Sequence, residues 1–443
     1  AGNVTAINAA IAYLGSITAG DIAGGTVTVS ERLLIDDTIV INNKAITVES
    51  TAGGFAHAQL ANSANNSGMD QGSLRWAGPA GIPMVQISQT LGATWRLPMQ
   101  GSSVAIGGAA PISYIDILDP GVNLPDNQST RIERCRLGGV GQGNTGYRAD
   151  NGIRVLGSTG NDRLFIEGVE IIGTTATGID FQNPNAIWTS MKDILVSGDD
   201  VQCAVGLRTV TDLDIVNLNF NRCDLAIDVP AASPSLNIVG LHAEHCPQIY
   251  LGDNSGSRLA VYGGRILCRG DTIGAGHIPI PEDGAIIDMD LNDGGTCVLE
   301  NVLFLGLEFY TVRPHLDFNA IRGGGGLRLH GCGQLRRTDV AFALGVGGTV
   351  MCDCLFVGDH EDLGAETQLY DGDMFRGRVV NPDTVMPSDL IGVTPSGGIP
   401  GGVTGGRPTP GAADRQVYFD DTLGYPVFWM GTQWVDSNGA GPV

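Results

Sequence analysis

The amino-acid sequence predicts an all-β fold, a parallel β-solenoid. Three observations lead to this prediction: short β-rich segments follow one another through most of the chain, a unit of about 23 residues repeats in its middle, and 66 of the 443 residues are glycine. Each unit contains strand and turn patterns without helical periodicity, and a unit of this size cannot bury its own apolar face. Successive units must therefore stack, so that the stack supplies the hydrophobic core.

The chain opens with its one clear helical pattern, in residues 4–14, and Gly15 stands where a helix would end. We expect residues 1–15 to cap the first coil, because an uncovered coil would expose a sheet edge. The apolar stripe of this helix consists of Val4, Ile7, Ile11 and Leu14. Short β-rich segments follow, separated by Gly, Asn, Asp and Pro: 24–29, 38–41, 45–50, 85–88 and 114–118.

The region 160–270 carries the repeat. Five segments align without gaps, and a second, less regular strand follows four of them. The aligned segments are 167–174, 190–197, 214–221, 237–244 and 260–267, and the second strands are 178–181, 205–208, 225–229 and 248–251. The register positions Ile171, Ile194, Leu218, Leu241 and Gly264 are 23, 24, 23 and 23 residues apart. Each of these positions is predicted to stack on the next, about 4.8 Å away, inside the solenoid.

One column of the alignment predicts a sharp bend. It consists of Glu170, Asp193, Asn217, Gly240 and Gly263. Asp, Asn and Gly tolerate the left-handed backbone that such a bend requires, so Asn217, Gly240 and Gly263 are expected to have positive φ. After the bend, alternation places Leu218 and Phe220 inside and the residues next to them outside.

The nine cysteines are expected to be buried, reduced side chains. Their spacing contains no CxxC pair, so neither a zinc ribbon nor a thioredoxin-like motif is indicated. Cys223 and Cys246 share a register position and are predicted to point inward as free thiols. Such use of cysteine is typical of a protein made in a reducing compartment.

Composition argues against several classes of function. The net charge of −22 disfavours nucleic-acid binding and attraction to anionic membranes, and no run reaches the ~20 apolar residues that span a bilayer. The segment 141–146 matches GxGxxG outside any βαβ context, so no cofactor is expected. The acidic segments 288–293 and 360–366 fit solvated loops better than the EF-hand pattern, and calcium binding there stays open.

Glycan cleavage would need two carboxylates at a fixed separation. In the alignment, Glu167 and Asp214 share a column two coils apart, about 9.6 Å by backbone spacing, which is near the upper limit for an inverting hydrolase. Glu170 and Asp193 lie one coil apart, closer to retaining geometry, but occupy the bend column. Glu244 is the third catalytic candidate.

A polar outward face provides the candidates for glycan binding. Asn219, His242 and Arg265 share one column, and Asn221 lies beside them in the column of Glu244. Such side chains bind hydroxyls and carboxylates, with the arginine as a bidentate anchor. An ordinary solvated wall of a solenoid would show the same pattern, and that interpretation stays open for each of these sets.

Both ends of the chain resemble one family. The opening TAINAAIAYL, AGGTVTV and TIVINNKAITVES resembles the entry of the pectate-lyase-like right-handed β-helix superfamily, as found in bacteriophage tailspikes and tail fibres. Residues 407–439 are similar to a short C-terminal module of phage tail proteins; residues 50–385 match in architecture only. The resemblance implies a right-handed β-helix in a virion appendage, commonly a homotrimer, that binds host surface glycans and sometimes cleaves them. It supplies no diagnostic catalytic residue.

The predicted organisation has four parts. A capping helix (1–15) precedes the parallel β-helix (16–385), and a Gly/Pro-rich linker (386–407) precedes a small aromatic-rich β module (408–443). The leading hypothesis is a tail spike or fibre, made in the host cytoplasm, that adsorbs to a bacterial capsule or lipopolysaccharide and contacts other tail proteins. The alternatives are a polysaccharide depolymerase, hydrolase or lyase, on the same scaffold and a purely structural virion fibre.

Overall fold

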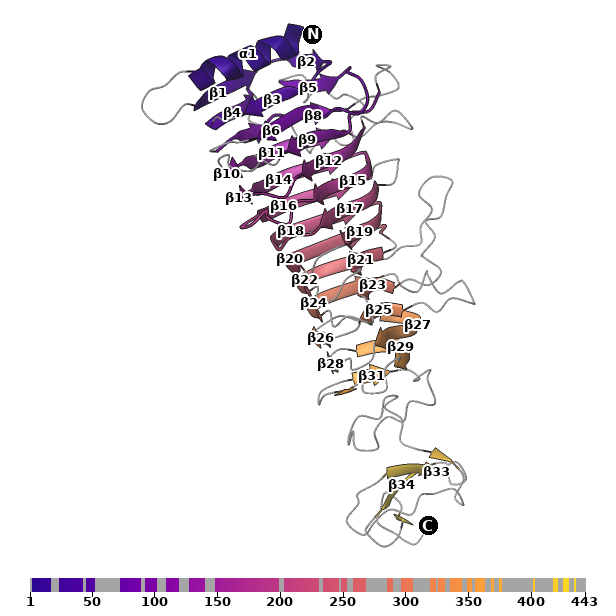
Figure 1. The fold of residues 1–443 in the computed structure, drawn as a ribbon. Coiled ribbons are helices and arrows are strands. Elements are labelled where there is room, and N and C mark those ends of the chain that lie inside the picture. The colour runs from indigo at the N-terminus through magenta and orange to yellow at the C-terminus, as the bar shows by residue number, and fades with distance from the viewer. Residues whose placement is uncertain are drawn as a thin grey trace.

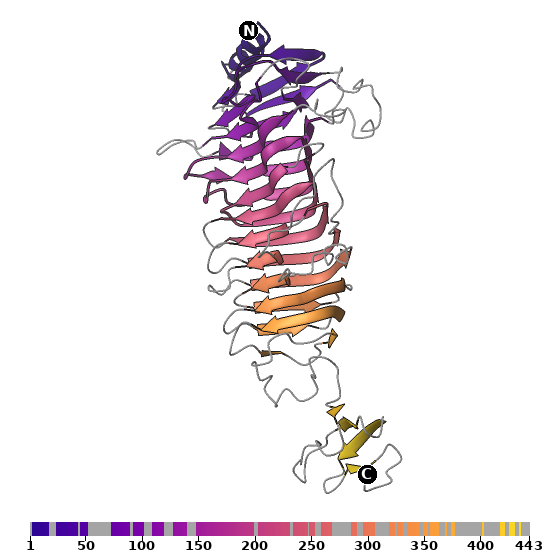
Figure 2. The same ribbon diagram turned by 90° about the vertical axis from the view of Figure 1, so that its right-hand side faces the viewer.

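A computed structural model of the chain describes most of residues 2–267 and, further on, the backbone of strands between 285 and 435. The ranges described up to 267 are 2–16, 24–42, 45–51, 72–88, 92–101, 109–118, 127–139, 148–198, 203–230, 234–246, 248–252 and 258–267. Two long sheets run side by side along a rod (Figures 1 and 2). Within each sheet the strands pair in parallel with the strand one coil away, which confirms the predicted all-β parallel β-helix.

The first long sheet, called sheet 1, runs through β1 (Gly24–Val29), β4 (Ala45–Ser50), β7 (Thr94–Arg96), β11 (Arg131–Gly138), β14 (Phe165–Ile172), β16 (Ser190–Ser197), β18 (Leu213–Asn221), β20 (Ser235–Glu244), β22 (Arg258–Leu267), β24 (Thr296–Leu305), β26 (Gly326–His330), β28 (Thr349–Cys352) and β30 (Gln368–Leu369). Three further strands join this sheet beside that path: β2 (Arg32–Ile35), β5 (Ser73–Trp76) and β8 (Met99–Gln100).

The second long sheet, called sheet 2, runs through β3 (Ile39–Asn42), β6 (Val85–Ser88), β9 (Ser113–Ile117), β12 (Ala149–Val155), β15 (Thr174–Phe181), β17 (Cys203–Thr209), β19 (Cys223–Val229), β21 (Gln248–Gly252), β23 (Ala285–Met289), β25 (Asn319–Gly323), β27 (Leu335–Leu344), β29 (Leu355–Asp362) and β31 (Met374–Arg376). A short pair is formed by β10 (Asn127–Gln128) and β13 (Asn161–Asp162).

A separate small sheet contains β32 (Gly401–Gly402), β33 (Val417–Asp420), β34 (Tyr425–Trp429) and β35 (Trp434–Val435). Its strands β33, β34 and β35 pair antiparallel, unlike those of the long sheets, whereas β32 pairs in parallel with β33. β32 lies inside the segment expected to be a linker.

The helix α1 (Gly2–Ser16) lies over the first strands of the rod (Figure 1). Val4, Ile7 and Ile11 are buried beneath it, as the apolar stripe predicts. Asn8 also satisfies backbone groups at the open edge, because its Oδ1 accepts from Val40 N at 3.0 Å and its Nδ2 donates to Thr38 O at 3.2 Å. The helix therefore covers apolar surface and supplies hydrogen bonds to a strand edge that would otherwise be exposed. Among the described residues, the structure contains no helix with the length and apolar character needed to cross a bilayer.

The bend column is confirmed at four positions and wrong at one. Asp193, Asn217, Gly240 and Gly263 have φ of 54°, 56°, 80° and 71°. On β14 the bend residue is Gly168, with φ of 62°, rather than Glu170.

The alignment of β14 on β16 was accordingly wrong by two residues. Ile171 stacks on Val196, and Ile194 stacks on Val169, whereas the predicted stacking of Ile194, Leu218 and Leu241 is confirmed. A shift of two preserves which side chains face inward, so the apolar pattern fits either register. Gly168 adopts the left-handed backbone at lower energetic cost than Glu170, and this preference favours the observed register of β14 on β16 over the predicted one.

The described cysteines are free and buried, as predicted for Cys223 and Cys246. Cys203 is the register partner of Cys223, and its Sγ lies 3.3 Å from Thr174 Oγ1. The remaining cysteines, from 268 onward, lie outside the residues whose side chains are described.

Sheet 2 contains a column of alternating charge, which we call the charge ladder. It consists of Asp116, Arg154, Asp180, Arg208 and Asp228 on consecutive strands. Arg154 Nε donates to Asp116 Oδ1 at 2.8 Å, and Arg208 Nε donates to Asp228 Oδ2 at 2.7 Å. The three aspartates are buried. Asp180, between the arginines, accepts from Gln182 Nε2 at 2.7 Å, and its Oδ1 is buried without a hydrogen-bond partner.

Candidate functional site

Sheet 1 brings the predicted glycan-binding residues together. Asn219, His242 and Arg265 are register neighbours on β18, β20 and β22, and Asn221 and Glu244 are neighbours two positions further along. Each lies beyond the bend and alternates with a buried residue such as Phe220. The side chains are therefore presented on the outer face at the spacing of adjacent strands, about 4.8 Å, although Asn221 Oδ1 is itself buried.

Asn219, His242 and Arg265 line an open groove of about 530 Å³ that follows the bend, here called the bend groove, whereas Asn221 and Glu244 are not among its lining residues. It crosses β14, β16, β18, β20 and β22, so ligand groups several strands apart can be contacted together. The lining residues are Gly168, Glu170, Asp193, Ile194, Leu195, Asn217, Asn219, Gly240, Leu241, His242, Gly264 and Arg265.

The bend itself creates the groove. A left-handed residue interrupts the inward and outward alternation, so that Val216 and Asn217 are both exposed before Leu218 turns inward. Glycine also allows the strands that line the groove to pack closely: a Cβ on Gly264 would lie 2.3 Å from Leu241 O. The backbones of β20 and β22 thus approach each other more closely here than a residue with a side chain would permit.

Two carboxylates at the groove are engaged by neighbouring strands. Glu170 Oε2 accepts from Arg136 Nε at 2.8 Å, and Arg136 Nη2 lies 2.7 Å from the same oxygen. Asp193 Oδ1 accepts from Asn217 Nδ2 at 2.7 Å. These contacts fix the acidic side of the groove in position. Arg265, at the other end of the column, is exposed.

Glu244, a predicted catalytic residue, lies between two histidines. Its Oε2 is 3.8 Å from His242 Nε2, and its Oε1 is 3.7 Å from His245 Nε2. Each oxygen of the carboxylate therefore has an imidazole close to it, beyond hydrogen-bond distance, and one of these imidazoles belongs to the glycan-binding column. Its catalytic role stays a prediction.

The proposed pairing of Glu167 with Asp214 in one column is wrong. Glu167 stacks on Lys192, and its Oε1 lies 3.2 Å from Lys192 Nζ; Asp214 stacks on Ser190. Two strands and two register positions separate the carboxylates, about 12 Å by backbone spacing. That exceeds the ~6.5–9.5 Å at which an inverting hydrolase places its two carboxyl groups. The cause is the same two-residue shift of β14.

Sequence reasoning missed some residues of this face. Arg136 could not be aligned because the coil that contains it is longer than the 23-residue repeat. Arg134 is the bend residue of this coil, with φ of 53°, and counting from that bend pairs Arg136 with Glu170. Trp188, exposed in the turn before β16, gives no periodic signal. Among the described residues, no three His, Cys, Asp or Glu side chains group as a metal site requires. The acidic segments considered for calcium lie outside the described side chains.

Comparison with known proteins finds no matching family model and no matching curated protein. Solved structures with a similar architecture include the catalytic domain of a GH87 α-1,3-glucanase in complex with nigerose, at 12% identity and a TM-score of 0.43, covering 85% of this chain and 66% of that one. DFA-IIIase from Arthrobacter chlorophenolicus A6 covers 84% of this chain and 89% of its own, at 12% identity and a TM-score of 0.38.

A tailspike protein, gp49 from Acinetobacter baumannii bacteriophage Fri1, described as a capsular polysaccharide depolymerase, is also similar. Its identity is 12% and its TM-score 0.34, with coverage of 84% of this chain and 55% of that one. This chain therefore spans about two thirds of the glucanase domain and about half of the tailspike. With identities and TM-scores this low, function has to be argued from the site itself.

Proposed function

We propose that the protein is a virion tail spike or fibre that adsorbs to a bacterial surface polysaccharide through the bend groove. The observation that carries this proposal is the column of Asn219, His242 and Arg265 along an open groove of about 530 Å³. The amide and imidazole suit sugar hydroxyls, and the guanidinium suits a sugar carboxylate. The resemblance of both chain ends to phage tail proteins supports the virion location.

A long groove suits a polymer better than a small metabolite. Small-molecule sites are concave and bury most of their ligand, whereas this groove is open along five strands. A polymer gains from such a surface because each contact can be weak while neighbouring contacts act together. The charge of −22 also fits a ligand held by hydrogen bonds and one cation rather than by a basic surface.

Binding to an array of purified bacterial capsular polysaccharides and lipopolysaccharides tests this proposal. Wild type should bind at least one polymer, and Arg265→Ala and His242→Ala should weaken that binding about tenfold or more. Arg134→Ala is the matched control, because it removes an exposed arginine from the same bend outside the groove. Loss of binding in the control to the same extent would contradict a specific role for the column.

Cleavage of the bound polymer is the second candidate function. It is favoured by the placement of Glu170 and Asp193 in the same groove as His242 and Arg265, which brings acidic and basic groups to one ligand path. Incubation with the polymer identified on the array, followed by assays for reducing ends and for the absorbance of unsaturated uronates, separates hydrolase from lyase. Binding without either product identifies an adhesin.

We also propose that the functional form is a homotrimer in contact with other tail proteins. The aromatic residues of β33–β35 support this, since a small sheet of four short strands encloses little core alone. Sedimentation analysis should give a trimer, and deletion of residues 400–443 should weaken it. A deletion variant that remains a tight trimer but no longer binds cells would make this module the receptor-binding part instead.

A further inference from the structure

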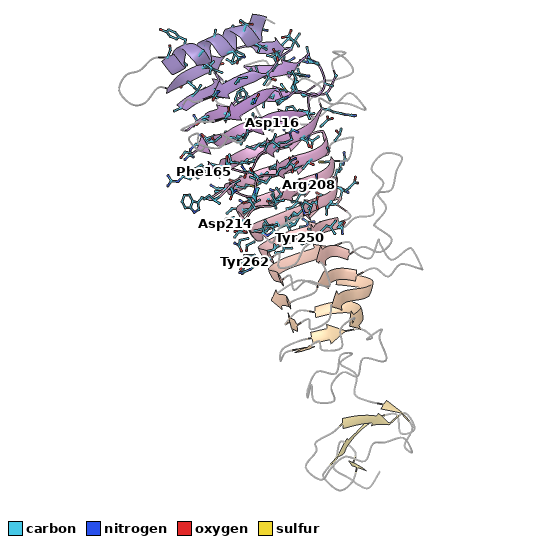
Figure 3. All side chains as sticks on the ribbon, in the orientation of Figure 1. Asp116, Phe165, Arg208, Asp214, Tyr250 and Tyr262 are labelled. Carbon is cyan, nitrogen blue, oxygen red and sulfur yellow. The ribbon has the colours of Figure 1, made fainter. Side chains whose placement is uncertain are left out.

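We propose that a second groove on sheet 1, centred on Trp188, binds a neutral or amino sugar of the same polysaccharide; this inference rests on the proposed function. The groove, here called the tryptophan groove, holds about 640 Å³. It lies along the turns that lead into β16, β18 and β20, whereas the bend groove lies further along these strands. Figure 3 labels Asp214, which lines it.

The exposure of Trp188 is the first observation. Its relative accessibility is 67%, and its neighbour Ile187 is at 45%, while Trp76 and Trp95 in the core are fully buried. An indole left in water forgoes a large hydrophobic stabilisation. A flat aromatic surface beside polar groups suits the apolar C–H face of a sugar ring, which can cover the indole without removing sugar hydroxyls from water.

The indole is also held in place before any ligand arrives. Arg163 lies over the ring, 5.5 Å from its centroid, and Arg163 N donates to Ile187 O at 3.1 Å. Trp188 has φ of 54°, a strained backbone for this residue type. Thr189 Oγ1 donates to Ala186 O at 2.8 Å and closes the same turn. With the guanidinium on one face of the ring, a sugar can stack on the other at little cost in side-chain entropy.

The polar lining defines the class of sugar. Asp214 Oδ1 accepts from Asn237 Nδ2 at 2.9 Å, and Asp212 Oδ1 accepts from Ser235 N at 2.6 Å. Each carboxylate keeps a second oxygen that can accept from a sugar hydroxyl or ammonium group. Among the described residues, no lysine or arginine lines this groove; the guanidinium of Arg163 lies beside it but is engaged over the Trp188 ring, whereas the carboxylates of Asp212 and Asp214 both line it. It therefore disfavours an acidic sugar, in contrast to the bend groove with Arg265.

The two grooves lie within reach of one polymer. Both cross β18 and β20, and the five residue-to-residue steps from Asp214 to Asn219 span at most about 17 Å. Exposed Val216 and Val239 form the ridge between them. A glycan that follows the bend groove and also crosses this ridge would place an acidic sugar at Arg265 and a neutral or amino sugar on Trp188. The predicted ligand is thus a polysaccharide whose repeat contains both kinds of unit.

Titration calorimetry with the polysaccharide identified on the array tests this inference. Trp188→Ala should weaken binding about tenfold or more, and Trp188→Phe, which keeps an aromatic face, should weaken it less. Tyr13→Ala is the matched control, because Tyr13 is equally exposed, at 67%, on the capping helix. On polymer whose carboxyl groups have been reduced to alcohols, Trp188→Ala should keep its effect while Arg265→Ala loses its own.

The outcomes separate this inference from the proposed function. If Trp188→Ala binds like wild type while Arg265→Ala is weakened, the tryptophan groove is not a sugar site and the proposed function stands. If Trp188→Ala changes the sedimenting mass, the groove is a contact between copies of the chain and the inference is wrong. If its effect disappears on the reduced polymer, the class of sugar is wrong. If wild type binds no polymer on the array, both proposals fail.

Discussion

The charge ladder and the bend groove are both columns of polar side chains on parallel strands, yet they end in opposite states. In the charge ladder, Arg154 and Arg208 each bind an aspartate one strand away, and the carboxylates are buried. In the bend groove, Asn219, His242 and Arg265 carry no alternating sign, so they do not neutralise each other along the column. The same stacking geometry therefore either pairs charged groups with one another inside the protein or leaves a group such as the Arg265 guanidinium exposed for a ligand, depending on which residue types follow one another.

The largest expected effect comes from breaking the ladder. Arg154→Met should lower the free energy of unfolding by about 3–5 kcal/mol, because it leaves Asp116 buried without its ion-pair partner and removes one of the two positive charges beside buried Asp180. Arg265→Met in the bend groove should change it by less than about 0.5 kcal/mol. Urea denaturation of both variants measures the contrast, and equal losses would contradict the distinction between the two columns.

The bend itself provides the next effect. Gly240→Ala should cost about 1–2 kcal/mol for a side chain at positive φ, plus a steric contribution, because the new Cβ would lie 2.9 Å from Asn217 Oδ1. Gly263→Ala is the control, since its φ of 71° is similar but a Cβ there meets nothing within 4 Å. Thermal or urea unfolding should show that Gly240→Ala is less stable than Gly263→Ala. The reverse order of stability would refute the close packing of the bend column.

Asp180 should make the stability of the charge ladder depend on pH. Burial raises the pKa of Asp180 above its usual 3.8, with Gln182 opposing. The folded state then binds more protons than the unfolded state between the two pKa values, so stability is fully present below pH 3.8 and is lost as the pH rises through the raised pKa. At neutral pH the charged carboxylate of Asp180 therefore makes folding less favourable than a neutral side chain of the same shape would.

Asp180→Asn should remove this loss. Denaturation at several pH values from about 4 to 7 should show the wild type losing stability relative to the variant as the pH rises. Asp193→Asn, on the exposed bend, serves as a comparison from sheet 1. Parallel pH profiles for wild type and Asp180→Asn would show that the carboxyl has the same pKa folded and unfolded.

The smallest effect is expected on the outer face of sheet 1. Lys192→Ala removes the 3.2 Å ion pair with Glu167, but these side chains are 51% and 44% exposed, so solvent screens the interaction. The free energy of unfolding should fall by less than about 0.5 kcal/mol, and added salt should reduce even that difference. A decrease in the free energy of unfolding as large as that of Arg154→Met would show that this exposed ion pair stabilises the protein as much as the buried pairs of the charge ladder do.

The sequence predicted the stack because the evidence for it is local and repeated. Asn217, Gly240 and Gly263 are residue types that accept positive φ, and the alternation around Leu218 and Phe220 fixes which side chains are buried. The error at Glu170 arose where alternation cannot help, since a two-residue shift leaves every side chain on its own face. The columns bearing Asn219 and Asn221 were correct because β18, β20 and β22 share one period.

Two features were beyond sequence reasoning for physical reasons. Asp180, Arg208 and Asp228 stood in the segments predicted as second strands, but opposite charges become a ladder only when the register between coils is known. Trp188 belongs to a turn, where no period constrains its position. Its significance depends on exposure and on Arg163, a residue 25 positions earlier that only the stacked structure brings to it.

The bend column has a consequence for how such a protein can diversify. Its successive residues Arg134, Gly168, Asp193, Asn217, Gly240 and Gly263 are 34, 25, 24, 23 and 23 positions apart, yet each has positive φ and stacks on the next. A coil can thus be up to eleven residues longer than the 23-residue repeat, with the extra residues placed away from the bend. The left-handed bend residues still stack, so the strands stay in register. During evolution, loop length and the side chains two positions after the bend can therefore change independently of each other. Such changes can alter the ligand that is recognised while the β-helix itself stays the same.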